Sequence, residues 1–214
     1  MVGLVTTPID LIREISTEET TLTKTDSKKR FHTRRASLQD VPAMMPLLEA
    51  YARQAEILPR SAADVYQSIR EWVVVEADGE LIGMGSLLIL WQDLAEVRSL
   101  VVSPDWQGYG VGRSIVEMLL IEAEALQLPR VFALTRRAGF FLKLGFSLTQ
   151  KELLPRKVMK DCVICPKFHA CDEVAVVLDL RPPLEQPSLQ PAVRPNAEST
   201  IPLIPVQVQS RSNS

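Results

Sequence analysis

The chain has 214 residues, 46% of them hydrophobic, and its formal net charge at pH 7 is -2. This length fits one globular domain with extensions, and the near-neutral charge argues against a nucleic-acid-binding or membrane-surface protein, which usually carries a strong basic excess. No apolar run approaches the ~20 residues that span a bilayer, and residues 1–30 lack the apolar block of a secretory signal, so we expect a cytoplasmic protein with no membrane or nucleic-acid partner.

Residues 31–180 alternate strand and helix patterns between two irregular ends. Strands are predicted over residues 31–36, 72–76, 81–90, 95–103, 131–135 and 173–180. Helices are predicted over residues 41–53, 61–70, 111–126 and 138–144. This order predicts one α/β domain, a mixed sheet with helices on both faces. We expect residues 1–30, rich in Thr, Ser, Glu and Lys, to form a flexible extension, and residues 181–214, rich in proline, to form a disordered tail.

Local chemistry predicts several of the element boundaries. Ser61 is followed three residues later by Asp64, which is the pattern of a capping box at a helix start. Asp78 and Gly79 separate two apolar runs and predict a tight hairpin turn. Gly145 follows the short helical pattern at 138–144 and is expected to end it in a left-handed conformation.

The strongest chemical signal is the glycine-rich stretch at residues 107–112, between a predicted strand and a predicted helix. Glycines let the backbone approach a ligand, and the free amides and dipole of a helix N-terminus favour an anion such as a pyrophosphate. No Lys-Ser or Lys-Thr follows, as a Walker-type loop requires, and the loop does not follow the first strand, as in a dinucleotide fold. A plain tight turn is the alternative.

This stretch resembles the acetyl-CoA signature of GNAT-family N-acetyltransferases: Gln or Arg, two residues, Gly, one residue, then Gly or Ala. Residues 138–146 are similar to the family's last helix and its Leu-Gly-Phe ending. The resemblance covers about residues 31–180 and implies the GNAT acyl-CoA N-acyltransferase fold with acetyl-CoA as co-substrate. The cofactor-binding residues it implies are Leu100, Val101, Val102, Gln107, Gly108, Tyr109, Gly110, Val111, Gly112 and Arg113.

Within the family, the stretches 57–61, 96–102 and 140–146 are similar to the acetyltransferase domain of N-acetylglutamate synthases. The resemblance implies acetyl transfer to the α-amine of L-glutamate in arginine biosynthesis. Those synthases often bear an amino-acid-kinase domain, which this chain is too short to contain, so a short, stand-alone form is expected. Another amine acceptor (an amino acid, a polyamine or a protein lysine) is the alternative, and a non-catalytic acyl-CoA sensor is a third. A homodimer is possible.

Acetyl transfer requires a base and a polarised thioester carbonyl. Glu96, at the start of the strand at 95–103, is the candidate general base, and its alternative role is a surface ion pair with Arg98 or another cation. The resemblance implies that a backbone N–H of Leu100 or Val101 contacts the thioester oxygen. Many GNAT enzymes place a tyrosine in the last helix as the acid, but Phe141 matches it here and cannot donate a proton.

Arg60 is the predicted anchor for a carboxylate of the substrate, because a guanidinium matches a carboxylate through two parallel hydrogen bonds. Arg98 and Ser99, beside the candidate base, are further predicted substrate-binding residues. The second carboxylate of glutamate has no assigned partner, and Lys157, Lys160 or Arg98 could supply one.

The cysteines form a cluster near the end of the predicted domain. Cys162 and Cys165 have CxxC spacing, and His169 and Cys171 could complete a tetrahedral zinc site. Since only one such pair is present, cysteines that pack under a loop are the favoured alternative, and the zinc site stays a hypothesis.

Overall fold

The computed structural model describes residues 29–154, 162–165 and 167–182. The predicted extension at 1–30 and tail at 181–214 lie almost wholly outside the described residues, as do Lys157 and Lys160. The strands are β1 (His32–Arg35), β2 (Trp72–Ala77), β3 (Glu80–Trp91), β4 (Leu94–Val102), β5 (Arg130–Thr135), β6 (Ser147–Thr149) and β7 (Val174–Asp179). The helices are α2 (Val41–Arg53), α3 (Ala62–Gln67), α4 (Val111–Ala125) and α5 (Ala138–Leu142). None of the helices in these described segments is long and apolar enough to cross a membrane.

The predicted elements are all present, with small shifts at their ends. The helix expected over 61–70 stops at Gln67 and continues as a 3-10 turn, and the three-residue strand β6 was not predicted. The Ser61 capping box is confirmed, since the Asp64 N–H donates to Ser61 Oγ at 3.1 Å. The hairpin turn is confirmed as well: Asp78 and Gly79 have φ values of 52° and 81°.

The sheet is mixed, with strand order β1-β2-β3-β4-β5-β7-β6. All neighbouring strands are antiparallel except β4 and β5, which are parallel. These two strands pair only where they begin, at Ala95 with Val131 and Glu96 with Phe132. The two parallel strands therefore diverge after their first residues, and the later parts of β4 and β5 are not paired with each other.

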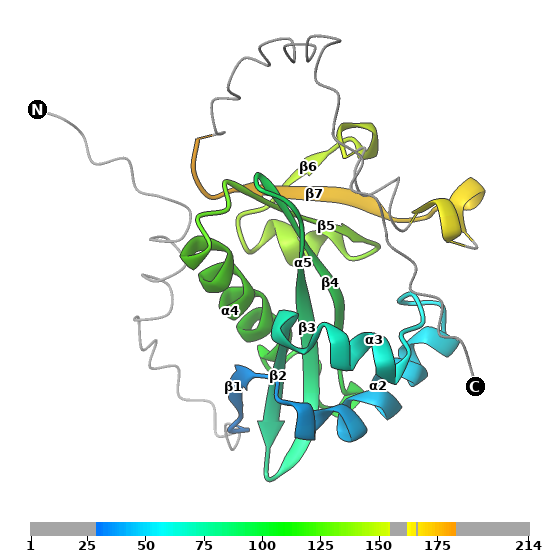
Figure 1. The fold of residues 1–214 in the computed structure, drawn as a ribbon, viewed down its shortest axis with the longest axis vertical. Helices are drawn as coiled ribbons and strands as arrows, with labels where there is room; N and C mark the ends of the chain where they lie inside the picture. The colour runs from blue at the N-terminus through cyan, green and yellow to red at the C-terminus, as the bar shows by residue number, and fades with distance from the viewer. Residues whose placement is uncertain (1–28, 155–161, 166, 183–214) are drawn as a thin grey trace, which may run out of the picture. The chain divides into compact units, whose positions relative to one another are not determined.

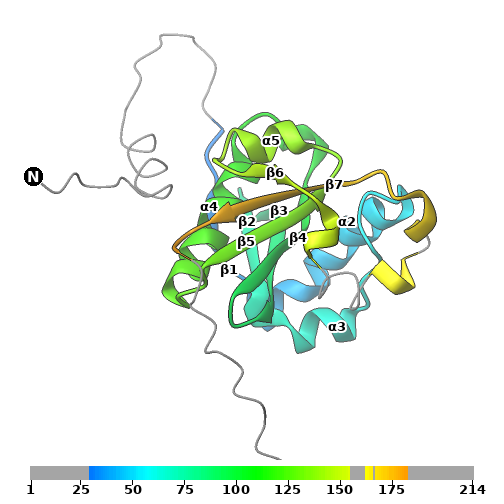
Figure 2. The ribbon, with the colours of Figure 1, turned by 90° about the horizontal axis from the view of Figure 1, so that it is seen from above.

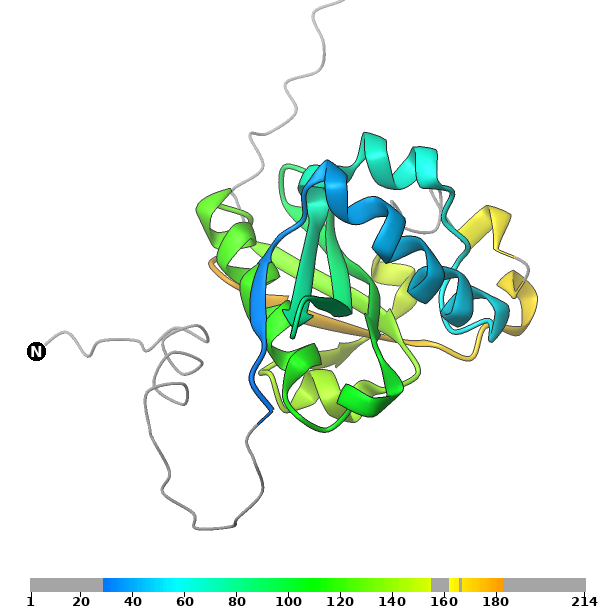
Figure 3. The ribbon, with the colours of Figure 1, turned by 90° about the horizontal axis from the view of Figure 1, so that it is seen from below.

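Helices cover both faces of the sheet, as the sequence predicted: α4 lies on one face, and α2 with α3 lies on the other (Figures 1 and 3). Successive side chains of β2 point to opposite faces of the sheet, so this one strand contributes to the cores on both faces. Val73 and Val75 pack in the core on the α4 side, whereas Trp72 and Val74 pack in the core on the α2 side. Helix α5 packs against β6 and β7 (Figure 2). Phe141 of this helix belongs to the α4-side core.

A β-bulge interrupts β4 at the middle of the strand. Met84 of β3 pairs with Val101 and Ser86 pairs with Arg98, so Ser99 and Leu100 together face Gly85. Ser99 has a φ of 51°, in the left-handed region that residues other than glycine seldom adopt. The extra residue reverses the alternation of side chains along the strand.

The reversal decides which side chains of β4 reach which layer. Before the bulge, Val97 packs on the α4 side, so its neighbours Glu96 and Arg98 point toward the α2 side. After the bulge, Leu100 packs on the α4 side and Val101 on the α2 side. The bulge thus places the two charged side chains of β4 on the face that carries α2 and α3.

Candidate active site

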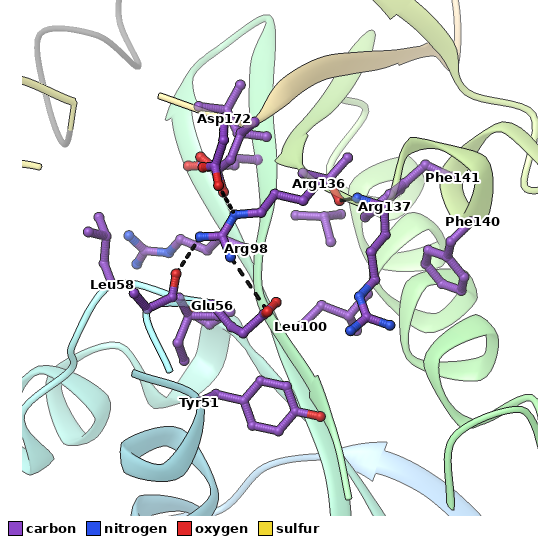
Figure 4. A pocket seen from close by; sticks show the side chains of 18 of the residues that line it. Tyr51, Glu56, Leu58, Arg98, Leu100, Arg136, Arg137, Phe140, Phe141 and Asp172 are labelled. Atoms are coloured by element: carbon purple, nitrogen blue, oxygen red, sulfur yellow. Dashed lines mark hydrogen bonds and ion pairs between the residues drawn. The ribbon is translucent and has the colours of Figure 1, made fainter. Parts of the chain in front are cut away.

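A cleft of about 1350 Å³ opens where β4 and β5 part. Its walls come from five segments that are far apart in the sequence. Figure 4 shows side chains from several of these segments. The lining residues lie within 51–60, 96–102, 106–113, 134–144 and the later stretch 151–173. The glycine-rich loop and the predicted substrate residues are therefore brought to one cavity.

The glycine-rich loop forms one end of this cleft. Gly108 and Gly110 have φ values of 84° and 90°, so the turn requires residues that tolerate the left-handed region. Gly110 is the N-cap of α4, and no side chain of the described residues caps that helix start. Its first-turn amides are therefore available to an anion.

Most of the predicted cofactor-binding residues line the cleft: Leu100, Val102, Gln107, Gly108, Gly110, Gly112 and Arg113. In the described part of the chain, Val101, Tyr109 and Val111 do not line it. Val101 and Val111 are each 1% exposed and belong to the core. Tyr109 faces outward instead, where its ring lies 4.4 Å from the Lys29 ammonium.

The backbone of β4 presents an open edge to the cleft. The Ser103 N–H donates to Ile82 O of β3, so the polar groups of the preceding residue, Val102, point away from β3. The Val102 carbonyl indeed accepts hydrogen bonds from outside the sheet, from the Tyr51 hydroxyl at 2.5 Å and from Gln107 Nε2 at 3.3 Å. Leu100, two residues back and part of the bulge, also lines the cleft.

Tyr51 was not among the predicted site residues. Its position in α2 fits the apolar face of that helix, so the sequence pattern alone indicates a core residue. The tyrosine instead reaches the cleft (Figure 4). There Gln107 Nε2 donates to its hydroxyl oxygen at 2.9 Å. The hydroxyl links α2, the open edge of β4 and the first residue of the glycine-rich loop.

The predicted catalytic and substrate residues line the other end of the cleft. Glu96 is only 3% exposed, so it is not a surface residue, and Arg98 forms an ion pair with Glu71 at 3.0 Å. Arg60 and Ser99 also line the cavity. Arg60 directly precedes Ser61, the N-cap of α3, so its backbone position is held by the capping box.

Arg136 was not among the predicted site residues. Its side chain connects two walls at this end of the cleft, the loop after α2 and the segment before β7 (Figure 4). Its Nε lies 3.0 Å from a carboxylate oxygen of Asp172, and a terminal nitrogen lies 3.5 Å from Glu56. Another terminal nitrogen donates to the Ala55 carbonyl, just past the end of α2. The residue after a strand end thereby connects the loop that carries Arg60 with the segment before β7.

The cysteine cluster does not form the hypothesised zinc site. Cys162, Cys165, His169 and Cys171 all line the cleft. Within residues 29–154, 162–165 and 167–182, no three His, Cys, Asp or Glu side chains come together as metal ligands. Cys171 instead accepts a hydrogen bond from Lys151 Nζ at 3.1 Å. A CxxC pair followed by a third cysteine was thus insufficient evidence for a metal centre.

Comparison with known proteins agrees with this geometry. The sequence model of the acetyltransferase (GNAT) family matches residues 41–146. An uncharacterized N-acetyltransferase of Chlorobaculum tepidum is 36% identical over 147 residues, which are 69% of this chain and 95% of that protein. An amino-acid acetyltransferase of Mycobacterium tuberculosis is 41% identical over 117 residues, 53% of this chain and 67% of that protein.

Two solved structures share the fold with bound coenzyme A. A Mycobacterium tuberculosis protein in complex with CoA superposes with a TM-score of 0.60 at 31% identity, over 70% of this chain and 99% of that one. The N-acetylglutamate synthase of Neisseria gonorrhoeae, complexed with coenzyme A and N-acetyl-glutamate, gives a TM-score of 0.64 at 26% identity. The match covers 71% of this chain but only 35% of that synthase. The chain belongs to the acetyltransferase (GNAT) family, has its fold, and is an acetyl-CoA-dependent N-acetyltransferase.

Proposed function

We propose that residues 31–180 transfer the acetyl group of acetyl-CoA to the α-amine of L-glutamate, as a cytoplasmic step of arginine biosynthesis. The observation that carries the proposal is the end of the cleft away from the glycine-rich loop. There Arg60 and Arg98 line the same cavity as the buried Glu96. The likeness to an amino-acid acetyltransferase and to a synthase solved with N-acetyl-glutamate supports it. A different amine is the second candidate, because the Chlorobaculum relative is uncharacterized.

Acetyl-CoA enters with its diphosphate at the amides of residues 107–112, where the start of α4 has no side-chain cap. Its pantetheine arm follows the open edge of β4, along Leu100 and Val102. The Val102 carbonyl already accepts from Tyr51 and Gln107, so it is held in a defined orientation before the coenzyme arrives. The cleft thus offers the amides of residues 107–112 for the diphosphate and the open edge of β4 for the pantetheine arm.

The amine nitrogen attacks the thioester carbonyl carbon, and the C–S bond then breaks to release CoA thiolate. Glu96, acting directly or through water, accepts the proton that the amine loses. The Leu100 N–H, beside the strained Ser99, donates to the carbonyl oxygen as negative charge develops there. A thiol of this type has a pKa of ~8.5, so the thiolate leaves without a dedicated acid. The buried Phe141 is compatible with that route.

Arg60 binds one carboxylate of glutamate from the entrance of α3. Arg98 is the described candidate for the second carboxylate, and its ion pair with Glu71 sets its orientation. A dicarboxylate is then preferred over a polyamine, because two guanidinium groups repel a cationic acceptor.

The test is thiol release from acetyl-CoA with glutamate, glutamine, aspartate, a polyamine and a lysine peptide as acceptors. We expect glutamate to give the highest kcat/KM. Arg60→Lys keeps the positive charge but cannot form the two parallel hydrogen bonds of a guanidinium. Because a charged hydrogen bond contributes ~1.5–3 kcal/mol, the KM for glutamate should rise about tenfold or more. The KM for acetyl-CoA should be unchanged.

Arg53→Lys is the matched control, because Arg53 is an exposed arginine of α2 outside the cleft. Its kinetics should equal those of the wild type. If glutamate is not acetylated, the glutamate assignment is wrong. If Arg60→Lys behaves like the control, Arg60 is not the anchor of the carboxylate.

A further inference from the structure

Two consecutive arginines follow β5, and they have opposite surroundings. Arg136 is occupied by Asp172, Glu56 and the Ala55 carbonyl. Arg137 is exposed, and within the described segments 29–154, 162–165 and 167–182 its guanidinium forms no hydrogen bond or ion pair. Both residues line the cleft. A cationic side chain that lies in a ligand cleft without a partner among the described residues is available to an anionic ligand.

The backbone holds Arg137 near the end of the cleft that the glycine-rich loop forms. Its N–H donates to Thr135 Oγ1 at 2.9 Å, and its carbonyl accepts from the Phe140 N–H at 3.0 Å. Phe140 in turn lies against the start of α4, since a Cβ placed on Gly112 would be 3.5 Å from its ring. Arg137 is therefore anchored one helical turn from the residue that touches the glycine-rich loop.

The side chain extends into the pocket and away from the Arg136 cluster (Figure 4). Of the other cations near this end, Arg113 has its Nε committed to Glu117 at 2.7 Å. The amides of the loop and the guanidinium of Arg137 thus flank the part of the cleft that the nucleotide end of acetyl-CoA would occupy. That end carries a diphosphate and a 3′-phosphate, and a guanidinium is suited to pairing with phosphate oxygens.

We propose that Arg137 binds a phosphate of acetyl-CoA from the wall opposite the glycine-rich loop. The proposal rests on the placement of the coenzyme at residues 107–112. The group it recognises is a phosphate oxygen, either of the 3′-phosphate monoester or of the diphosphate. Arg137 is accordingly a determinant of coenzyme affinity, and it has no role in binding the acceptor amine.

The experiment measures binding of CoA, of 3′-dephospho-CoA and of phosphate-free pantetheine to the wild type, Arg137→Gln and Arg137→Lys. Calorimetry serves for the first two ligands and a ligand-observed NMR titration for the third. We expect Arg137→Gln to weaken CoA about tenfold or more and Arg137→Lys to weaken it less, while pantetheine binds all three proteins equally. Arg53→Gln, with the same change of charge outside the cleft, should bind CoA like the wild type.

Comparison of the ligands identifies the phosphate that Arg137 binds. If Arg137→Gln no longer weakens binding when the ligand is 3′-dephospho-CoA, the partner is the 3′-phosphate. If the affinity for 3′-dephospho-CoA still falls, the partner is the diphosphate. An affinity of Arg137→Gln for CoA within about twofold of the wild type overturns the proposal, and so does an equal loss for pantetheine, which has no phosphate. A Gly110→Asp variant that keeps full CoA affinity would instead refute the placement of the coenzyme at the loop, whatever Arg137 does.

Discussion

Gly110→Asp tests where the diphosphate of acetyl-CoA binds. Gly110 has a φ of 90° and lines the cleft, and a Cβ there would meet nothing within 4 Å. The substitution is therefore sterically open, and aspartate is among the residues that best tolerate the left-handed region, so the loss of stability should be about 1 kcal/mol. The added carboxylate, however, would stand where the diphosphate is proposed to lie.

Coulomb's law gives the size of the effect on binding. A carboxylate ~6 Å from a phosphate charge, at an effective dielectric constant of ~20, repels it by about 2–3 kcal/mol. CoA affinity should therefore fall roughly 30- to 150-fold. Titration calorimetry with CoA measures this directly, and urea unfolding of the same samples reports the stability.

Gly79→Asp is the matched control. Gly79 also has a positive φ, 81°, and a Cβ at this position would likewise meet open space, but Gly79 lies in the β2–β3 hairpin outside the cleft. The variant should lose similar stability and bind CoA normally. A folded Gly110→Asp protein with the CoA affinity of this control would refute the assignment of the loop.

Three other substitutions test single contacts. Glu96→Gln should lower kcat about 10²- to 10⁴-fold and leave CoA affinity nearly unchanged; a loss below about fivefold across the pH range would assign proton removal elsewhere. Tyr51→Phe removes the hydroxyl from Val102 and Gln107, so CoA should bind about two- to tenfold more weakly by calorimetry, and wild-type affinity would exclude this role. The Arg34 guanidinium, 2.7 Å from Asp40, holds the pKa of that carboxyl well below its usual 3.8. Because this folded-state pKa is depressed, the stabilisation is present at neutral pH and lost as the pH falls below about 4 toward the folded pKa. Urea unfolding should therefore show Asp40→Asn less stable by about 1–2 kcal/mol at pH 7, with a smaller gap at pH 3, and a constant gap would contradict the linkage.

The features that the sequence alone determined are local ones. The capping box at Ser61 depends on residues three apart, and the hairpin at Gly79 depends on two adjacent residues with positive φ. The helix at 41–53 follows from the spacing of apolar residues on one face, and the cofactor loop follows from glycines at the junction of a strand and a helix. Such patterns are sufficient because the interacting groups are neighbours in the chain.

Only the tertiary structure decided which distant residues share the cleft. Tyr51 and Gln107 are 56 positions apart, and Arg136 reaches Ala55 across 81 positions, so no periodicity along the chain relates them. The bulge at Ser99 is equally invisible in the sequence, because it depends on the register between β3 and β4. It also decides that Glu96 and Arg98 face the α2 layer. The contrast between the adjacent arginines, Arg136 paired and Arg137 exposed, has the same cause, since a side chain acquires its partners only when separate elements pack together.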